Sequence, residues 1–246
     1  MIYGIMQPYF FPYIGYFSLI DYSDRFIFFD TPQYINHGWV NRNRVLKQDG
    51  TPNYIIVPLQ KAPRETAIKD MRIRPEDWRG KIYGQLDVYR KKAPNFKSTM
   101  DFLHSILDPW EGESLSELNI YTTEAVSRQI GITTPFDVSS RMQLELPEIK
   151  APDEWALYIT KALGGDVYVN PPGGMSFFDP AKYEAAGIDL RFLKANLPPY
   201  VQRIGHFEPG LSIIDVMMYN DAAAITDMLH DFEILHSSGL PAEGEA

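Results

Sequence analysis

The sequence predicts an α/β protein built on a mainly parallel, open sheet with helices on its faces. Short apolar runs rich in β-branched and aromatic residues alternate along the chain with longer segments of helical periodicity. Strands that are joined through helices pair in parallel, because only a crossover connection brings the chain back to the same sheet end. The composition, with 45% apolar and 22% charged side chains in 246 residues, supplies enough apolar surface for a sizeable core.

The first half of the chain predicts a strand, a helix and further strands, followed by helices. Residues 2–6 form an apolar strand that Gln7 and Pro8 end, because proline has no amide hydrogen for a ladder. Ser114 and Glu117 have the spacing of a capping box at a helix start. The further elements expected here are a helix at 14–22, strands at 25–30 and 54–59, and helices at 78–91 and 114–129.

The second half continues the alternation. We expect strands at 136–139, 166–169 and 187–193, and helices at 153–163, 211–218 and 221–230. Residues 1–235 are interpreted as a single α/β domain, with a helical insertion at about 75–130 and a flexible tail at 236–246. The predicted architecture is therefore Rossmann-like.

Charge and composition exclude several classes of protein. The formal net charge is −9, which argues against a binder of nucleic acid that depends on bulk positive charge. The chain has no cysteine, which excludes disulfides, thiolate metal sites and a cysteine nucleophile. No apolar run approaches the roughly 20 residues that span a bilayer, so we expect a cytoplasmic protein with no membrane partner. No motif of a serine hydrolase, a zinc protease or a dinucleotide-binding loop occurs, and no metal site is predicted.

The most unusual stretch is the aromatic segment, residues 7–17, which holds six aromatic side chains in eleven positions. It follows the first predicted strand, and the loop after a strand of an open α/β sheet faces the ligand crevice. The candidate site residues here are Gln7, Tyr9, Tyr13 and Tyr16. The alternative is an aromatic plug that packs over the sheet as core.

A second candidate is the polar segment, residues 30–44, which follows the next strand. His37 is a candidate general acid or base, because an imidazole with a pKa of about 6.5 exchanges protons near neutral pH. Arg42 and Arg44 point to the same side of an extended chain, which suits a phosphate or carboxylate. Capping and surface pairing are the structural alternatives. The remaining candidates are Asp30 as a base, and Gln33, Trp39, Asn41 and Asn43 as binding residues.

Two later motifs add binding candidates. Asn170, Gly173 and Gly174 follow a predicted strand, where paired glycines permit a close ligand contact or simply a turn. Ser212 is a candidate binding residue or a helix cap. Asp215 and Asn220 lie on or just after the same apolar helix, and we expect an arginine to partner a buried Asp215.

Four motifs resemble one family over nearly the whole chain. They are IMQPYFFPYIGYFSLI (5–20), FFDTPQYINHGWVNRNRV (28–45), YVNPPGG (168–174) and PGLSIIDVMMYN (209–220). They are similar to the WbqC-like proteins found with bacterial surface-polysaccharide and O-antigen biosynthesis genes. The resemblance implies transfer of an amino acid, glycine in particular, onto an amino sugar or a similar small-molecule amine.

A remoter resemblance concerns layout. The first strand, the aromatic segment and the following helix are similar in order to the HxGH nucleotidylyltransferases, with Tyr13 and Tyr16 in place of both motif histidines. Tyrosine donates a hydrogen bond but carries no positive charge near neutral pH. This layout implies ATP as a co-substrate.

These observations leave three hypotheses. The first is an aminoacyltransferase that takes its acyl group from a phosphopantetheine thioester on a carrier protein or from an aminoacyl-tRNA, with His37 or Asp30 as base. The second is an ATP-dependent ligase or nucleotidyltransferase. The third is a non-catalytic protein that binds a carrier or a ligand.

Overall fold

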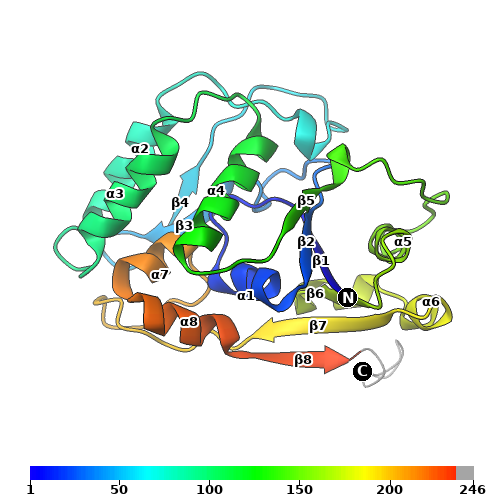
Figure 1. The fold of residues 1–246 in the computed structure, drawn as a ribbon. Helices are drawn as coiled ribbons and strands as arrows, with labels where there is room; N and C mark the ends of the chain where they lie inside the picture. Colours follow the sequence, from blue (N-terminus) through cyan, green and yellow to red (C-terminus); the bar gives the residue numbers. More distant parts are fainter. Residues whose placement is uncertain (237–246) are drawn as a thin grey trace.

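The computed structural model describes residues 1–236, and these residues contain a six-stranded sheet in the order β5-β2-β1-β6-β7-β8 (Figure 1). Neighbouring strands are parallel except β7 and β8, which are antiparallel. The predicted α/β class and mainly parallel sheet are therefore confirmed. The strands are β1 (Ile2–Met6), β2 (Arg25–Phe28), β5 (Phe136–Val138), β6 (Val167–Asn170), β7 (Asp189–Ala195) and β8 (Phe232–His236).

The order of the strands reverses between β1 and β6. From β1 the chain continues to β2 on one side, and from β6 it continues to β7 on the other side. Loops that leave the carboxyl ends of two such strands diverge and leave a crevice between them. The fold therefore places such a crevice beside the carboxyl ends of β1 and β6.

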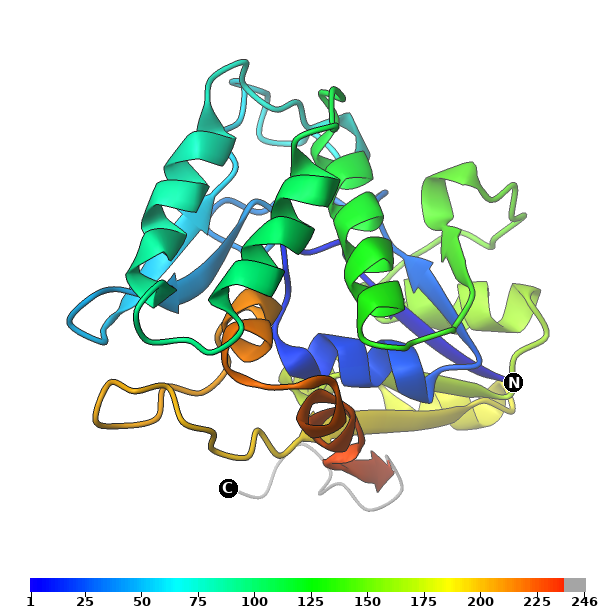
Figure 2. The ribbon, with the colours of Figure 1, turned by 60° about the vertical axis from the view of Figure 1, so that its left-hand side comes forward.

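Alternating side chains give the sheet two apolar faces. Phe26, Phe28 and Leu193 pack with helices α1 (Ile14–Tyr22) and α8 (Ala222–His230). Tyr3, Ile27 and the other strand residues that point to the opposite face pack with α5 (Glu154–Ala162) and α6 (Pro180–Ala185). Figures 1 and 2 show these helix pairs on opposite sides of the sheet.

Two glycines allow α1 to lie close to the sheet. A Cβ on Gly4 would come within 2.5 Å of the Ser23 hydroxyl, and one on Gly15 within 2.8 Å of the Ala195 Cβ. Gly15 therefore brings the first turn of α1 against the end of β7.

The chain between β2 and β5 leaves the sheet and forms a second group of elements (Figure 2). The strand predicted at 54–59 is formed by residues 52–56, and it pairs with the strand before it in a separate antiparallel hairpin. One apolar cluster joins this hairpin and its helices to α1 and the sheet. The elements are β3 (Arg42–Leu46), β4 (Pro52–Ile56), α2 (Trp78–Leu86), α3 (Phe96–Leu107) and α4 (Leu115–Gln129).

Several boundaries differ from those expected. The helix predicted at 78–91 ends at Leu86 and continues as a single 3-10 turn. Helices α3 and α6 and the edge strand β8 were not predicted, and β8 includes His236, the first residue of the expected tail. Residues 237–246 of that tail lie outside the described residues, and the assignment of a single domain stays a prediction. The closing helix α7 spans Ile213–Tyr219.

In the described part of the chain, no helix combines the length and apolarity needed to cross a membrane.

Candidate functional site

A cavity of about 670 Å³ lies at the carboxyl ends of β1 and β6. This is the position at which the strand order reverses, and its size suits a drug-sized organic molecule. Part of its lining comes from the aromatic segment, and another part comes from the loop after β6 and the start of α5. The lining includes Gln7, Tyr9, Tyr13, Tyr16, Trp39, Asn43, Trp155, Tyr168, Asn170, Gly173, Gly174, Phe177, Leu197 and Gly210.

The aromatic segment divides its rings between the core and the cavity. Phe10, Phe11 and Phe17 are buried in the core. Tyr9, Tyr13 and Tyr16 line the cavity. The phenylalanines thus form the core plug and the tyrosines line the cavity, and a ligand-binding role for this segment stays a prediction.

Buried polar side chains hold the aromatic segment in place. The Asn43 amide donates to the backbone carbonyls of Phe10 at 3.1 Å and of Phe11 at 2.9 Å. The Ser212 hydroxyl donates to the Phe11 carbonyl at 2.8 Å, and its oxygen also caps α7. These bonds fix a loop in which Phe11 has a φ of +40°, a conformation that is uncommon without glycine.

Hydroxyl and amide groups are distributed over the cavity wall. The Tyr16 hydroxyl donates to the Gln7 carbonyl at 2.9 Å, and the Tyr168 hydroxyl donates to Asn170 Oδ1 at 2.9 Å. The Asn170 amide in turn donates to the Pro171 carbonyl. The hydroxyls of Tyr9 and Tyr13 and the Gln7 side chain make no hydrogen bond with another described residue, so they are available to a ligand.

The phenols on this wall are donors. Burial raises the pKa of the Tyr9, Tyr13 and Tyr16 phenols above the ordinary value of 10.0. These groups therefore stay protonated well beyond neutral pH.

The cavity wall is uncharged. Of the described residues that line it, none is an aspartate, glutamate, histidine, lysine or arginine. Charged groups lose solvation in such surroundings, so the wall favours the neutral form of a bound ligand.

The polar segment lies largely outside this cavity. His37 is exposed, at the corner of a turn in which the Gly38 amide donates to the Ile35 carbonyl. Arg42 donates to the carbonyls of His37 and Gly38 and so holds that turn. The structure thus places the predicted general base away from the lining.

Asp30 is a buried structural carboxylate. It accepts hydrogen bonds from the Ser139 hydroxyl at 2.9 Å and from the Ser140 amide and hydroxyl at 3.0 and 2.7 Å. It thereby ties the end of β2 to the turn that follows β5. Gln33 donates to the Arg64 carbonyl, and Asn41 bonds with the Tyr34 hydroxyl and the Val57 carbonyl.

Arg44 and Asp215 also make internal contacts. Arg44 pairs with Glu208 at 3.2 Å and donates to the carbonyls of Pro209 and Gly210. We expected an arginine to partner Asp215, but no arginine among the described residues forms a hydrogen bond with it. The carboxylate instead accepts hydrogen bonds from Tyr200 at 2.5 Å, Tyr89 at 2.6 Å and Gln202 at 3.0 Å. Burial is the largest influence on the Asp215 carboxyl and raises its pKa.

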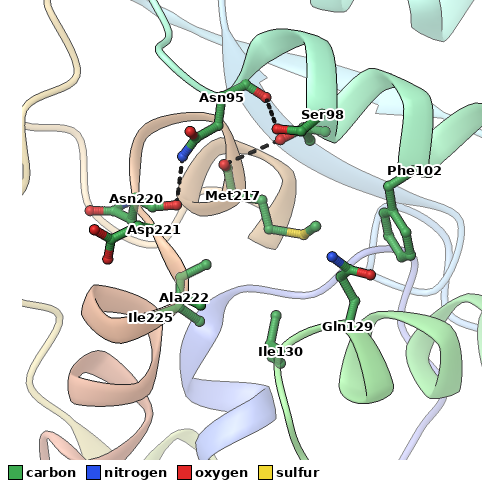
Figure 3. A pocket seen from close by; sticks show the side chains of 11 residues that line it. Asn95, Ser98, Phe102, Gln129, Ile130, Met217, Asn220, Asp221, Ala222 and Ile225 are labelled. Atoms are coloured by element: carbon green, nitrogen blue, oxygen red, sulfur yellow. Dashed lines mark hydrogen bonds between the residues drawn. The ribbon is translucent and has the colours of Figure 1, made fainter.

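Asn220 lies at a second, smaller cavity of about 230 Å³ between α3, α7 and α8 (Figure 3). There the Asn95 amide donates to the Asn220 carbonyl at 2.8 Å. The Thr99 hydroxyl donates to the Met217 carbonyl at 3.2 Å, and Ser98 donates to the Asn95 carbonyl (Figure 3). Asn220 therefore lies at a different cavity from the candidates that line the larger one, although it ends the same helix α7 that Ser212 caps and that carries Asp215.

The cavity brings together half of the candidates. Those in its lining are Gln7, Tyr9, Tyr13, Tyr16, Trp39, Asn43, Asn170, Gly173 and Gly174. Those outside it are Asp30, Gln33, His37, Asn41, Arg42, Arg44, Ser212, Asp215 and Asn220.

Sequence reasoning missed the wall formed by Trp155, Phe177 and Leu197. Trp155 and Phe177 are large apolar residues that remain exposed, by 37% and 67%. Exposure of this kind is a property of the folded chain. The one signal in the sequence is that Trp155 lies in the first turn of the helix predicted to begin after Pro152.

Comparison with known proteins assigns the chain to a family. The model of the WbqC-like protein family matches residues 7–227, which is nearly the whole length. The chain belongs to the WbqC-like family. This WbqC-like chain is also 29% identical over 228 residues to the uncharacterized protein Rv1507c of Mycobacterium tuberculosis, a match that covers 92% of the chain and 96% of that protein. No solved structure matches this WbqC-like sequence.

Proposed function

We propose that this chain is an aminoacyltransferase that joins an activated amino acid, glycine in particular, to the amine of an amino sugar or a related small molecule. The observation that carries the proposal is the uncharged wall of the cavity at the ends of β1 and β6. An amine attacks a carbonyl only as the neutral species, and an apolar site lowers the pKa of a bound amine because it disfavours the ammonium ion.

The composition of the wall suits a sugar ring. Trp155, Phe177 and the tyrosines offer apolar surface to the C–H groups of the ring. Gln7, Tyr9 and Tyr13 supply hydrogen-bonding groups for sugar hydroxyls or for the acyl carbonyl.

The reaction balances without a covalent intermediate on the chain. The amine nitrogen attacks the carbonyl carbon of the donor, the bond to the leaving thiolate or ribose oxygen breaks, and the amine proton passes to the leaving group or to solvent. A tyrosine hydroxyl stabilises the negative charge that develops on the carbonyl oxygen. Since Tyr9 and Tyr13 stay protonated, they fill this role at neutral pH.

A second candidate is an ATP-dependent ligase. The strand order and the crevice between β1 and β6 favour it, because nucleotides bind at such positions in open α/β sheets. The uncharged wall weighs against it, since the described lining offers no cationic side chain to the phosphates.

The test is mass spectrometry of the products formed from glycyl-loaded carrier protein and an amino-sugar nucleotide, with and without ATP. The proposal predicts an acceptor whose mass has grown by one glycyl group in the absence of ATP. A product that forms only with ATP would support the ligase instead. A folded protein that binds the acceptor and yields no product with carrier-bound or tRNA-bound donors would be a binding protein.

A further inference from the structure

The hairpin of β3 and β4 has one face that the rest of the described chain covers only in part, where residues 208–210 contact Arg44. Its register sets Arg42 opposite Ile56 and Arg44 opposite Tyr54. Asn43, Val45 and Ile55 on the opposite face are buried. We call the open side, formed by Trp39, Arg42, Arg44, Tyr54 and Ile56, the hairpin face.

Large apolar side chains stay exposed on the hairpin face. The exposed fractions are 39% for Trp39, 38% for Tyr54 and 41% for Ile56. The rings of Trp39 and Tyr54 lie 6.5 Å apart. A group of such side chains on a surface marks a place where another molecule binds.

The hairpin face carries a positive charge that no described carboxylate neutralises. Arg44 pairs with Glu208. Arg42 lies 4.4 Å from the centroid of the Tyr54 ring and donates only to backbone carbonyls among the described residues. In a chain with a net charge of −9, this local charge favours an anionic ligand.

The hairpin face is continuous with the cavity. Trp39 belongs to both, and Gly210 of the cavity wall accepts a hydrogen bond from Arg44. A ligand that extends out of the uncharged cavity past Trp39 therefore reaches arginine and aromatic side chains.

We propose that the hairpin face binds the nucleoside phosphate part of the acceptor, and hence that the acceptor is a nucleotide-linked amino sugar. Arg42 binds the phosphate, the Trp39 and Tyr54 rings contact the base, and the sugar enters the cavity. Guanidinium groups suit phosphates, and aromatic side chains stack on bases. This inference rests on the proposed function, since it names the acceptor class. A phosphopantetheine chain offers the same phosphate without an aromatic ring.

The test is titration calorimetry of the whole chain with uridine diphosphate, inorganic phosphate and phosphopantetheine as separate probes. We expect uridine diphosphate to bind more tightly than the other two. Arg42→Gln and Tyr54→Ser should each weaken its binding by about tenfold. Tyr54→Ser guards against loss of the turn that Arg42 holds, since the Tyr54 hydroxyl makes no hydrogen bond with a described residue.

Arg90→Gln is the matched control, because Arg90 also lies over an aromatic ring, Phe96, at 5.0 Å but outside the hairpin face and the cavity. The Arg90→Gln variant should bind uridine diphosphate with the same affinity as the unmodified chain. Affinity for uridine diphosphate that survives both hairpin variants, tighter binding of phosphopantetheine, or no nucleotide binding by the folded protein would each overturn the inference.

The binding titrations, together with the transfer assay, distinguish failure of the hairpin site from failure of the proposed function. Glycyl transfer onto a free amino sugar, with no nucleotide binding, would refute the hairpin site and leave the transferase standing. Nucleotide binding that is lost in both hairpin variants, without transfer from any donor, would refute the transferase and leave the hairpin site standing.

Discussion

The aromatic segment and the polar segment follow neighbouring strands, and the structure uses them in opposite ways. The aromatic segment, apolar in sequence, lines the cavity and presents hydroxyls to it. The polar segment, rich in charged and amide groups, directs most of them to carbonyls and hydroxyls of the protein. Polar groups that fold into the interior must find partners there, so a dense polar stretch indicates loop architecture as much as it indicates a site.

Asp30→Ala should show the largest effect. It leaves the Ser140 amide and two serine hydroxyls without their acceptor, and we expect a loss of about 3 kcal/mol in the free energy of unfolding. Urea denaturation followed by circular dichroism measures it. Asp101→Ala, at an exposed helix position paired with Lys97, serves as the control and should leave the midpoint unchanged. Stability retained in Asp30→Ala together with lost transfer would assign Asp30 to chemistry.

Asn43→Ala should have the next largest effect on stability. The carbonyls of Phe10 and Phe11 lose their donor, which should cost about 2 kcal/mol of unfolding free energy. The loosened aromatic segment should also weaken acceptor binding. Asn53→Ala, in the same hairpin but with no side-chain hydrogen bond to a described residue, should change neither quantity. Equal effects of the two variants would contradict the anchoring role of Asn43.

Tyr13→Phe removes one hydroxyl from the cavity wall and should leave stability unchanged. We expect glycyl transfer to slow by about tenfold, which corresponds to the roughly 1.4 kcal/mol of one hydrogen bond. Single-turnover kinetics with loaded carrier measure the rate. Tyr121→Phe, whose ring stacks on Trp110 outside the cavity, is the control. If Tyr13→Phe transfers glycine at the same rate as this control, the Tyr13 hydroxyl takes no part in the reaction.

His37→Ala should have the smallest effect. Because the imidazole lies in an exposed turn outside the lining, transfer should change by less than about twofold. The pH profile of the rate is the sharper measurement. Loss of a titration near the pKa of histidine in His37→Ala would restore this residue as the general base.

The fold could be predicted where the pattern is local. Prolines, glycines and apolar runs marked β1, α1, β2, α4, β6 and β7 closely. Strand β8 was missed because Glu233 and His236 interrupt its apolar character, and an edge strand is defined by the neighbour with which it pairs.

The candidate site could be predicted only in part, for the same reason. Proximity to strand ends indicated Gln7, Tyr13 and Asn170, and the structure places all three in the lining of one cavity, because the topology sends those loops to one crevice. The roles of Asp30 and Arg44 depend on Ser140 and on Glu208, which lie 110 and 164 residues away along the chain. No local pattern encodes such partners.

In the proposed aminoacyltransferase, the uncharged cavity holds the acceptor amine in its neutral form. The most direct measurement is a pH titration, by nuclear magnetic resonance, of an amino-sugar nucleotide labelled with ¹⁵N at the amine, free and bound to the protein. We expect a lower amine pKa in the bound state, because the cavity wall disfavours the ammonium ion. A bound amine whose pKa is unchanged or raised would contradict it.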